Sequence, residues 1–290
     1  MCRIWKFAQA AVLLLCGYVC FAAGSSADVP PALAVSADDA QDAYTLPILM
    51  YHSILPDLSR AGDYVLPPEV LEEDLRYLRE KGYESVTVED LLAYVDKGTP
   101  LPDQPILLSF DDGYYNNCVY LPPLLEAYEM CAVVSPVGSF ADAYEESGDR
   151  NLLYAMADWS ALKALAEHPR IELQNHSYCL HQETPRLGAR RCAGESEADY
   201  QAMLFADLAA MQDAMESRLG VRPQAFVYPF GAVDEASGQV LRALGFRASF
   251  SCSSRHNRIT RDPDCLWLLG RYNRPYGIST ADFMRSVGID

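Results

Sequence analysis

Residues 106–113 read Ile106-Leu107-Leu108-Ser109-Phe110-Asp111-Asp112-Gly113, an apolar run that ends in two adjacent aspartates and a glycine. The run is short and rich in branched aliphatic residues, so it predicts a buried β-strand. A second run of this kind, residues 171–175, leads into His176, and His181 follows five residues later. One carboxylate and two imidazoles leave a divalent metal an open position, as in hydrolytic zinc sites. The other carboxylate would then be free to accept a proton.

Short β-rich runs alternate with helical periods along the chain. The expected strands are residues 46–51, 105–110, 131–136, 171–175, 225–228, 246–251 and 266–271. The expected helices are residues 68–81, 88–95, 120–129, 160–166, 198–219 and 235–244. This alternation predicts βαβ units with a parallel sheet, and about seven strands without a break favour a barrel over two separate halves.

The carboxyl ends of the strands form the site in such barrels. The chemically interesting side chains gather at or just beyond these ends, namely His52, Asp111, Asp112, His176, His181, Tyr228 and Pro229. This shared location is the main internal support for one common site.

The first residues have the features of an export signal. Arg3 and Lys6 precede an apolar stretch over residues 8–23, and small residues follow it. We expect a signal peptide over residues 1–23, a flexible linker over 24–43 and one folded domain over 44–290. The protein would be a monomer that is secreted or associated with the cell envelope. It would meet a membrane only through the first segment, which is shorter than the roughly 20 residues of a spanning helix.

The formal net charge of −17 argues against a nucleic-acid partner, because such a surface repels phosphate. Six cysteines follow the signal, and an oxidising compartment would allow some of them to pair. Cys252 with Cys265 and Cys179 with Cys192 are possible bridges, and six free thiols are the alternative.

The motifs resemble those of the polysaccharide deacetylases with a NodB homology domain, carbohydrate esterase family 4, over about residues 46–278. Residues 109–113 resemble the first motif, which implies that Asp111 is the general base and Asp112 a metal ligand. His176-Ser177 and His181 resemble the second motif, which implies two histidine ligands. Their spacing of five is similar to that of exported poly-N-acetylglucosamine deacetylases of biofilm systems. The implied fold is a distorted (β/α)7 barrel.

Residues 226–231 resemble the third motif, which lines the substrate groove and offers a backbone N–H to the oxyanion. This implies substrate contacts from Tyr228, Pro229 and Phe230. The aromatic residues near the strand ends add Trp159 as a second groove wall beside Tyr228.

Two features depart from the family pattern. Val227 occupies the position of the usual arginine of the third motif, so Arg271 or Arg274 would brace the base, and Arg271 could also contact substrate. The late histidine motif that usually supplies the catalytic acid has no match. The resemblance to the biofilm branch places His52 in that role, with a structural or substrate-binding role as the alternative.

The resemblance implies a metal-dependent hydrolysis of N-acetyl groups on a glycan of the N-acetylglucosamine type. Two histidines and one aspartate suit zinc, and cobalt, nickel or iron would use the same ligands. Two other functions stay open, a non-catalytic glycan-binding or scaffold protein on this fold and an O-acetyl esterase acting on xylan. A phosphatase with an aspartate nucleophile is disfavoured, because it needs an Asp-x-Asp spacing that residues 111–113 lack.

Overall fold

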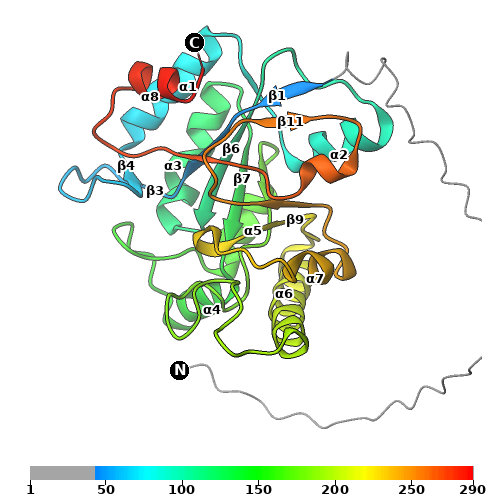
Figure 1. Cartoon of the computed structure of the whole chain (residues 1–290). Helices are drawn as coiled ribbons and strands as arrows, with labels where there is room; N and C mark the ends of the chain where they lie inside the picture. Colours follow the sequence, from blue (N-terminus) through cyan, green and yellow to red (C-terminus); the bar gives the residue numbers. More distant parts are fainter. Residues whose placement is uncertain (1–42, 290) are drawn as a thin grey trace, which may run out of the picture. The chain divides into compact units, whose positions relative to one another are not determined.

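The central strand is the one that carries the two aspartates. In the computed structural model, which describes residues 43–289, β6 (Pro105–Asp112) is buried along its whole length. It pairs in parallel with β2 (Ile48–Tyr51) on one side and β7 (Ala132–Pro136) on the other. β8 (Ile171–Leu173) extends the sheet beyond β7, and β12 (Tyr272–Asn273) extends it beyond β2 (Figure 1). The short β5 (Glu84–Ser85) pairs with the start of β6.

Two further strands complete a ring of seven. β9 (Ala225–Val227) and β10 (Ala248–Phe250) form their own parallel pair. Single parallel bridges join this pair to its neighbours, from Asn175 after β8 to Phe226 and from Phe250 to Leu269 before β12. Because β12 pairs with β2, the strands follow one another around a barrel whose continuous ladders are interrupted at these two joins. This confirms the expected distorted (β/α)7 architecture.

Short antiparallel and peripheral pairs lie outside this ring. β1 (Tyr44–Leu46) pairs with β11 (Asn257–Ile259), and β3 (Ser53–Ile54) pairs with β4 (Val65–Leu66). Residues 1–42 lie outside the described part of the chain. The expected signal peptide and all but the last residue of the expected linker therefore lie outside the described residues as well.

The six expected helices are present with shifted ends. They are α1 (Pro68–Glu80), α2 (Val88–Lys97), α3 (Tyr115–Ala127), α5 (Trp159–Ala166), α6 (Glu197–Leu219) and α7 (Ser237–Ala243). Two more helices were not expected, α4 (Gly138–Ser147) and α8 (Thr280–Ser286). α4 buries only Gly138 and Ala141, and α8 has only seven residues, so neither carries a strong apolar period.

One expected strand is wrong. Residues 266–271 do not form a strand, because the 3-10 helix η3 (Pro263–Leu266) takes up the start of the run. The Asp262 side chain caps η3 by accepting from the N–H of Asp264. The chain then makes only the single bridge at Leu269 before it reaches β12.

The longest helix, α6, connects two parts of the core. The Ser196 side chain caps its start, and Gly220 ends it in the left-handed region with a φ of 74°. Leu204 and Leu208 pack with the residues of β9, while Met211 and Met215 pack in the cluster beneath β6 and β7. Both methionines are fully buried core residues.

No disulfide joins any of the six cysteines of the described residues, so neither of the two possible bridges is formed in this structure. Among residues 43–289, no helix has both the length and the apolar character needed to cross a bilayer.

A buried ion pair ties the last strand to the first helix of the barrel. Asp74 on α1 receives two hydrogen bonds from Arg274, at 2.9 and 3.1 Å, and a third from the Thr280 hydroxyl at 2.6 Å. Both charged side chains are fully inaccessible to solvent. The backbone N–H of Arg274 also donates to the carbonyl of Met50 on β2. The pair therefore fixes the position at which β12 meets β2.

We expect Arg274→Met to lower the free energy of unfolding by about 3–5 kcal/mol, because it leaves the Asp74 carboxylate buried without its partner. Urea denaturation followed by circular dichroism measures this change. Arg222→Met is the matched control, since Arg222 forms an exposed pair with Glu216 and should cost at most about 1 kcal/mol. Equal losses in the two variants would show that the buried pair has no special weight.

Candidate active site

The turn after β6 separates the two aspartates. Asp112 and Gly113 both have left-handed backbone conformations, with φ values of 69° and 78°. A Cβ atom on Gly113 would lie 2.8 Å from the Cβ of Pro136 on the neighbouring strand, so only glycine fits there. This sharp reversal at the strand end lets two consecutive carboxylates meet different partners.

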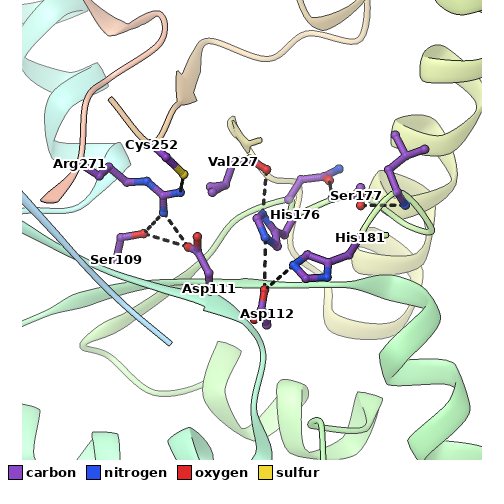
Figure 2. A network of polar contacts seen from close by, with 11 residues as sticks. Ser109, Asp111, Asp112, His176, Ser177, His181, Val227, Cys252 and Arg271 are labelled. Carbon is purple, nitrogen blue, oxygen red and sulfur yellow. Dashed lines mark hydrogen bonds and ion pairs between the residues drawn. The ribbon is translucent and has the colours of Figure 1, made fainter. Parts of the chain in front are cut away.

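The two histidines converge on one oxygen of Asp112. The Nε2 atoms of His181 and His176 lie 3.0 and 3.4 Å from its Oδ1 (Figure 2). The Nδ1–H of His176 donates to the carbonyl of Val227 at 2.8 Å, so Nε2 is the ring nitrogen that faces Asp112. The carbonyl belongs to β9, so two strands of the barrel orient this ring.

The Asp112–His176–His181 cluster has the composition and geometry of a metal site. The three candidate ligand atoms lie within 4.8 Å of one another. Asp112 Oδ1 is buried, and no described residue gives it a hydrogen bond of good geometry. Burial alone would raise the pKa of Asp112, but the two histidines hold it well below its usual range. Such an orphaned, ionised oxygen beside two imidazoles fits a divalent metal.

Asp111 has a different partner. Arg271 donates to Asp111 Oδ1 at 2.7 Å and to the Ser109 hydroxyl at 2.8 Å (Figure 2). Its Nε also donates to the carbonyl of Ser251, and the guanidinium is fully buried. Burial acts to raise the pKa of Asp111, yet Arg271 and the nearby histidines lower it below its ordinary value. Asp111 is therefore ionised while remaining outside the Asp112 cluster.

Of the two arginines suggested for bracing the base, the structure places only Arg271 beside it. Arg274 is instead paired with Asp74 on α1. Arg271 also lines the pocket described below, but its donors are directed at protein atoms.

A pocket of about 490 Å³ opens over these residues. Asp111, Asp112, His176 and His181 all line it. The other lining residues come from strands and loops and are Met50, His52, Tyr64, Tyr114, Glu183, Phe230, Cys252, Ser254, Arg271 and Asn273. Tyr64, Glu183, Cys252 and Asn273 were not expected there. They lie in or beside irregular loops, where no period in the sequence indicates which residues face a cavity.

His52 lies in this pocket at the end of β2. Its ring packs edge-on against Tyr64 at 4.8 Å, and its Nδ1 is buried without a hydrogen-bond partner among the described residues. The Asn117 side chain holds its backbone carbonyl at 2.7 Å. Burial lowers the pKa of His52, although Asp111 and Asp112 act to raise it. His52 therefore lies in the same pocket as Asp111, where the predicted acid would act.

The expected groove walls need correction at two positions. The Tyr228 hydroxyl shares a hydrogen bond of 2.6 Å with Ser237 inside the core, and the Trp159 indole donates to Asp142 at 2.7 Å. Both side chains are buried and neither lines the pocket, because their large rings fill space between helices and the sheet.

The third motif contributes Phe230 instead. Pro229 is buried at the start of the 3-10 helix η2 (Pro229–Gly231), and it does not line the pocket. Phe230 is 42% exposed, has a φ of 58°, and places its ring 4.5 Å from that of His181. Its side chain therefore covers one histidine of the candidate metal site.

The sequence matches the family model described as polysaccharide deacetylase over residues 98–249, which is more than half of the chain. This chain belongs to the polysaccharide deacetylase family. The matched segment contains Asp111, Asp112, His176 and His181, so the family match includes both halves of the site. The predicted family is thereby confirmed.

Two curated relatives show the extent of the similarity. The poly-β-1,6-N-acetyl-D-glucosamine N-deacetylase of Escherichia coli K12 is 25% identical over 228 residues, which cover 71% of this chain and 34% of the relative. A putative polysaccharide deacetylase of Bacillus subtilis is 31% identical over 93 residues, about a third of each chain. The chain thus spans about a third of the length of these relatives.

Solved structures share the fold. The de-N-acetylase from Aggregatibacter actinomycetemcomitans has a TM-score of 0.70 at 19% identity, over 84% of this chain and all of that one. IcaB from Ammonifex degensii has a TM-score of 0.66 at 22% identity, over 84% of this chain and 96% of that one.

We expect His176→Ala and Asp112→Asn to abolish stoichiometric zinc binding, because each removes one of three ligands around a single position. Isothermal titration of the metal-free protein with zinc measures the stoichiometry and affinity. His168→Ala is the matched control, since His168 pairs with Glu126 away from the site. Full zinc occupancy in His176→Ala would refute the ligand assignment.

Proposed function

We propose that this protein removes N-acetyl groups from a glycan of the poly-β-1,6-N-acetylglucosamine type by metal-assisted hydrolysis. One observation carries the proposal: Asp111 is ionised and braced by Arg271 directly beside a three-ligand cluster that leaves an open coordination position. The substrate class is supported by the activity named for the E. coli relative.

The residues divide the work between binding and proton transfer. Asp112, His176 and His181 would hold a divalent cation, for which this ligand set favours zinc, with cobalt or nickel as substitutes. When bound, the cation would polarise the acetyl carbonyl and make water a nucleophile near neutral pH.

Asp111 is the proposed general base. It is ionised, it lies in the pocket, and Arg271 occupies only part of its carboxylate. It would accept the proton of the attacking water as the new C–O bond forms. The backbone N–H of Phe230 is the proposed donor to the developing oxyanion, an interaction that is typically worth about 2.7–4 kcal/mol.

His52 is the proposed general acid. Its buried, unpartnered Nδ1 lies in the same pocket as Asp111, where the leaving amine must collect a proton before the C–N bond breaks. The two carboxylates favour the protonated ring, which offsets part of the effect of burial.

We also propose that the protein is exported from the cytoplasm. The signal-like pattern of residues 1–23 supports it, and a polymeric N-acetylated glycan would be encountered outside the cytoplasm. The mass of the mature chain isolated from its own cells would test the removal of that segment.

We expect the zinc-loaded protein to release acetate from poly-β-1,6-N-acetylglucosamine, and chelation to stop the release. Asp111→Asn should lower the rate by about 10²–10⁴-fold, because the amide cannot accept the proton. Asp96→Asn, which changes an exposed carboxylate paired with Arg247, should keep the rate of the unchanged protein.

The alternatives give different results in the same assay. Acetate release from acetylated xylan alone would favour an O-acetyl esterase. Glycan binding without acetate release from any acetylated polymer would favour a non-catalytic binding protein.

We expect His52→Asn to separate two substrates with different leaving groups. Release from the glycan should fall by about 10²–10⁴-fold, since an amine leaves only when protonated. Hydrolysis of 4-nitrophenyl acetate should fall far less, because a nitrophenolate leaves without a proton. Similar losses on both substrates would assign His52 a structural role.

A further inference from the structure

The turn between the two histidines is held by a carboxylate from another element. The backbone N–H of Tyr178 donates to Asp207 Oδ1 at 2.9 Å, and that of Cys179 donates to Asp207 Oδ2 at 2.8 Å. Asp207 lies in the middle of α6, far from His176 and His181 in sequence. One side chain thus fixes two consecutive peptide groups of the segment that carries both imidazoles.

The remaining N–H groups of this turn are also engaged. The N–H of Ser177 donates to the Asn175 side chain at 2.7 Å, and that of Leu180 donates to the Ser177 hydroxyl at 3.1 Å (Figure 2). Ser177 has a φ of 77°, which is an unfavourable conformation for a residue with a side chain. Such a conformation persists only where the surroundings fix it, and Asp207 holds the two peptide N–H groups that follow Ser177.

The part of α6 that carries Asp207 is anchored in the core. Leu208, the next residue, is fully buried, and its carbonyl accepts a hydrogen bond of 3.4 Å from the Asn175 side chain. Asn175 also makes the single bridge to β9. The helix, the end of β8 and β9 therefore form one connected frame around the turn.

The Asp207 carboxylate is partly removed from solvent, unlike that of Asp213 on the same helix. Burial raises the pKa of Asp207 to about 6, and the two backbone N–H groups oppose that rise. Asp213 on the same helix is exposed. A partly desolvated carboxylate that receives two N–H bonds is an arrangement suited to holding a loop in one conformation.

We propose that Asp207 is a positioning residue that sets the metal affinity of the site by fixing His181 relative to His176 and Asp112. The inference rests on the proposed metal site and adds a residue that contacts neither the metal nor the substrate. His181 is partly exposed, and its ring also faces Asp112 through Nε2 at 3.0 Å and packs near Phe230 at 4.5 Å and Phe140 at 5.6 Å. The clamp on the peptide groups of Tyr178 and Cys179 thus constrains the turn that directs its Nε2 towards Asp112.

The test uses Asp207→Asn on the whole chain. The asparagine has the same size, but its amide can accept only one of the two N–H bonds and directs an NH₂ group at the other. We expect zinc affinity to fall by about 10–100-fold, the usual effect of losing a group that orients a ligand. The visible spectrum of the cobalt-substituted protein should also change, because the coordination geometry relaxes.

Asp213→Asn is the matched control, with the same substitution on the same helix. Asp207→Glu is a second variant that keeps the charge but adds a methylene group, and it should also weaken zinc binding because the carboxylate no longer matches the two N–H groups. Urea denaturation of each metal-free variant reports stability separately, and metal titration is carried out on the folded protein.

Wild-type zinc affinity and an unchanged cobalt spectrum in both Asp207 variants would overturn the proposal, even if stability fell, because the contact would then be structural only. Failure of the proposed metal site itself gives a different result. In that case the unchanged protein and Asp213→Asn would not bind zinc at this position either.

Discussion

Two carboxylates lie side by side at the buried end of β6, and the structure must compensate each negative charge separately. Removing a charge from water costs several kcal/mol unless a partner of opposite charge or good hydrogen bonds replace the lost hydration. Asp111 has Arg271 as its partner, and Asp112 faces two imidazoles. The left-handed turn at Asp112 and Gly113 makes this division possible, because it sends consecutive side chains to different neighbours. The proposed division into a base and a metal ligand therefore follows from the need to compensate each buried carboxylate with its own partner.

The sequence predicted the site better than its surroundings. Asp111, Asp112, His176 and His181 follow apolar runs that could be recognised without any structure, and the barrel brings these strand ends together. Phe230, which the resemblance names as a substrate contact, lines the pocket. Tyr228 and Trp159 were not, since an aromatic residue near a strand end can fill the core as readily as it can face a groove, and local sequence does not distinguish the two. The pattern of the strands likewise left open which arginine would reach Asp111.

The parts that could not be predicted depend on contacts distant in sequence. Asp207 is 28 residues from Cys179, and nothing in the amphipathic pattern of α6 separates it from the exposed Asp213. The run at residues 266–271 looked like a strand because it is apolar, but the proline and the Asp262 cap just before it favoured a 3-10 helix. At residues 266–271, helix capping therefore outweighed the strand propensity of the apolar run. At Asp207, local sequence contained no signal that could have predicted the contact with the turn.

Arg271 and Arg274 connect the chemistry of the site to the closure of the barrel. They flank β12, the strand that pairs with β2, and both guanidinium groups are fully buried. One neutralises Asp111 in the pocket, while the other joins Asp74 on α1. Because only the two residues of β12 separate them, a shift of β12 along β2 would move both pairs together. The position of this two-residue strand thus determines how closely Arg271 approaches Asp111, and so how strongly the pKa of Asp111 is lowered. The barrel holds that short strand in register through the buried Asp74–Arg274 pair.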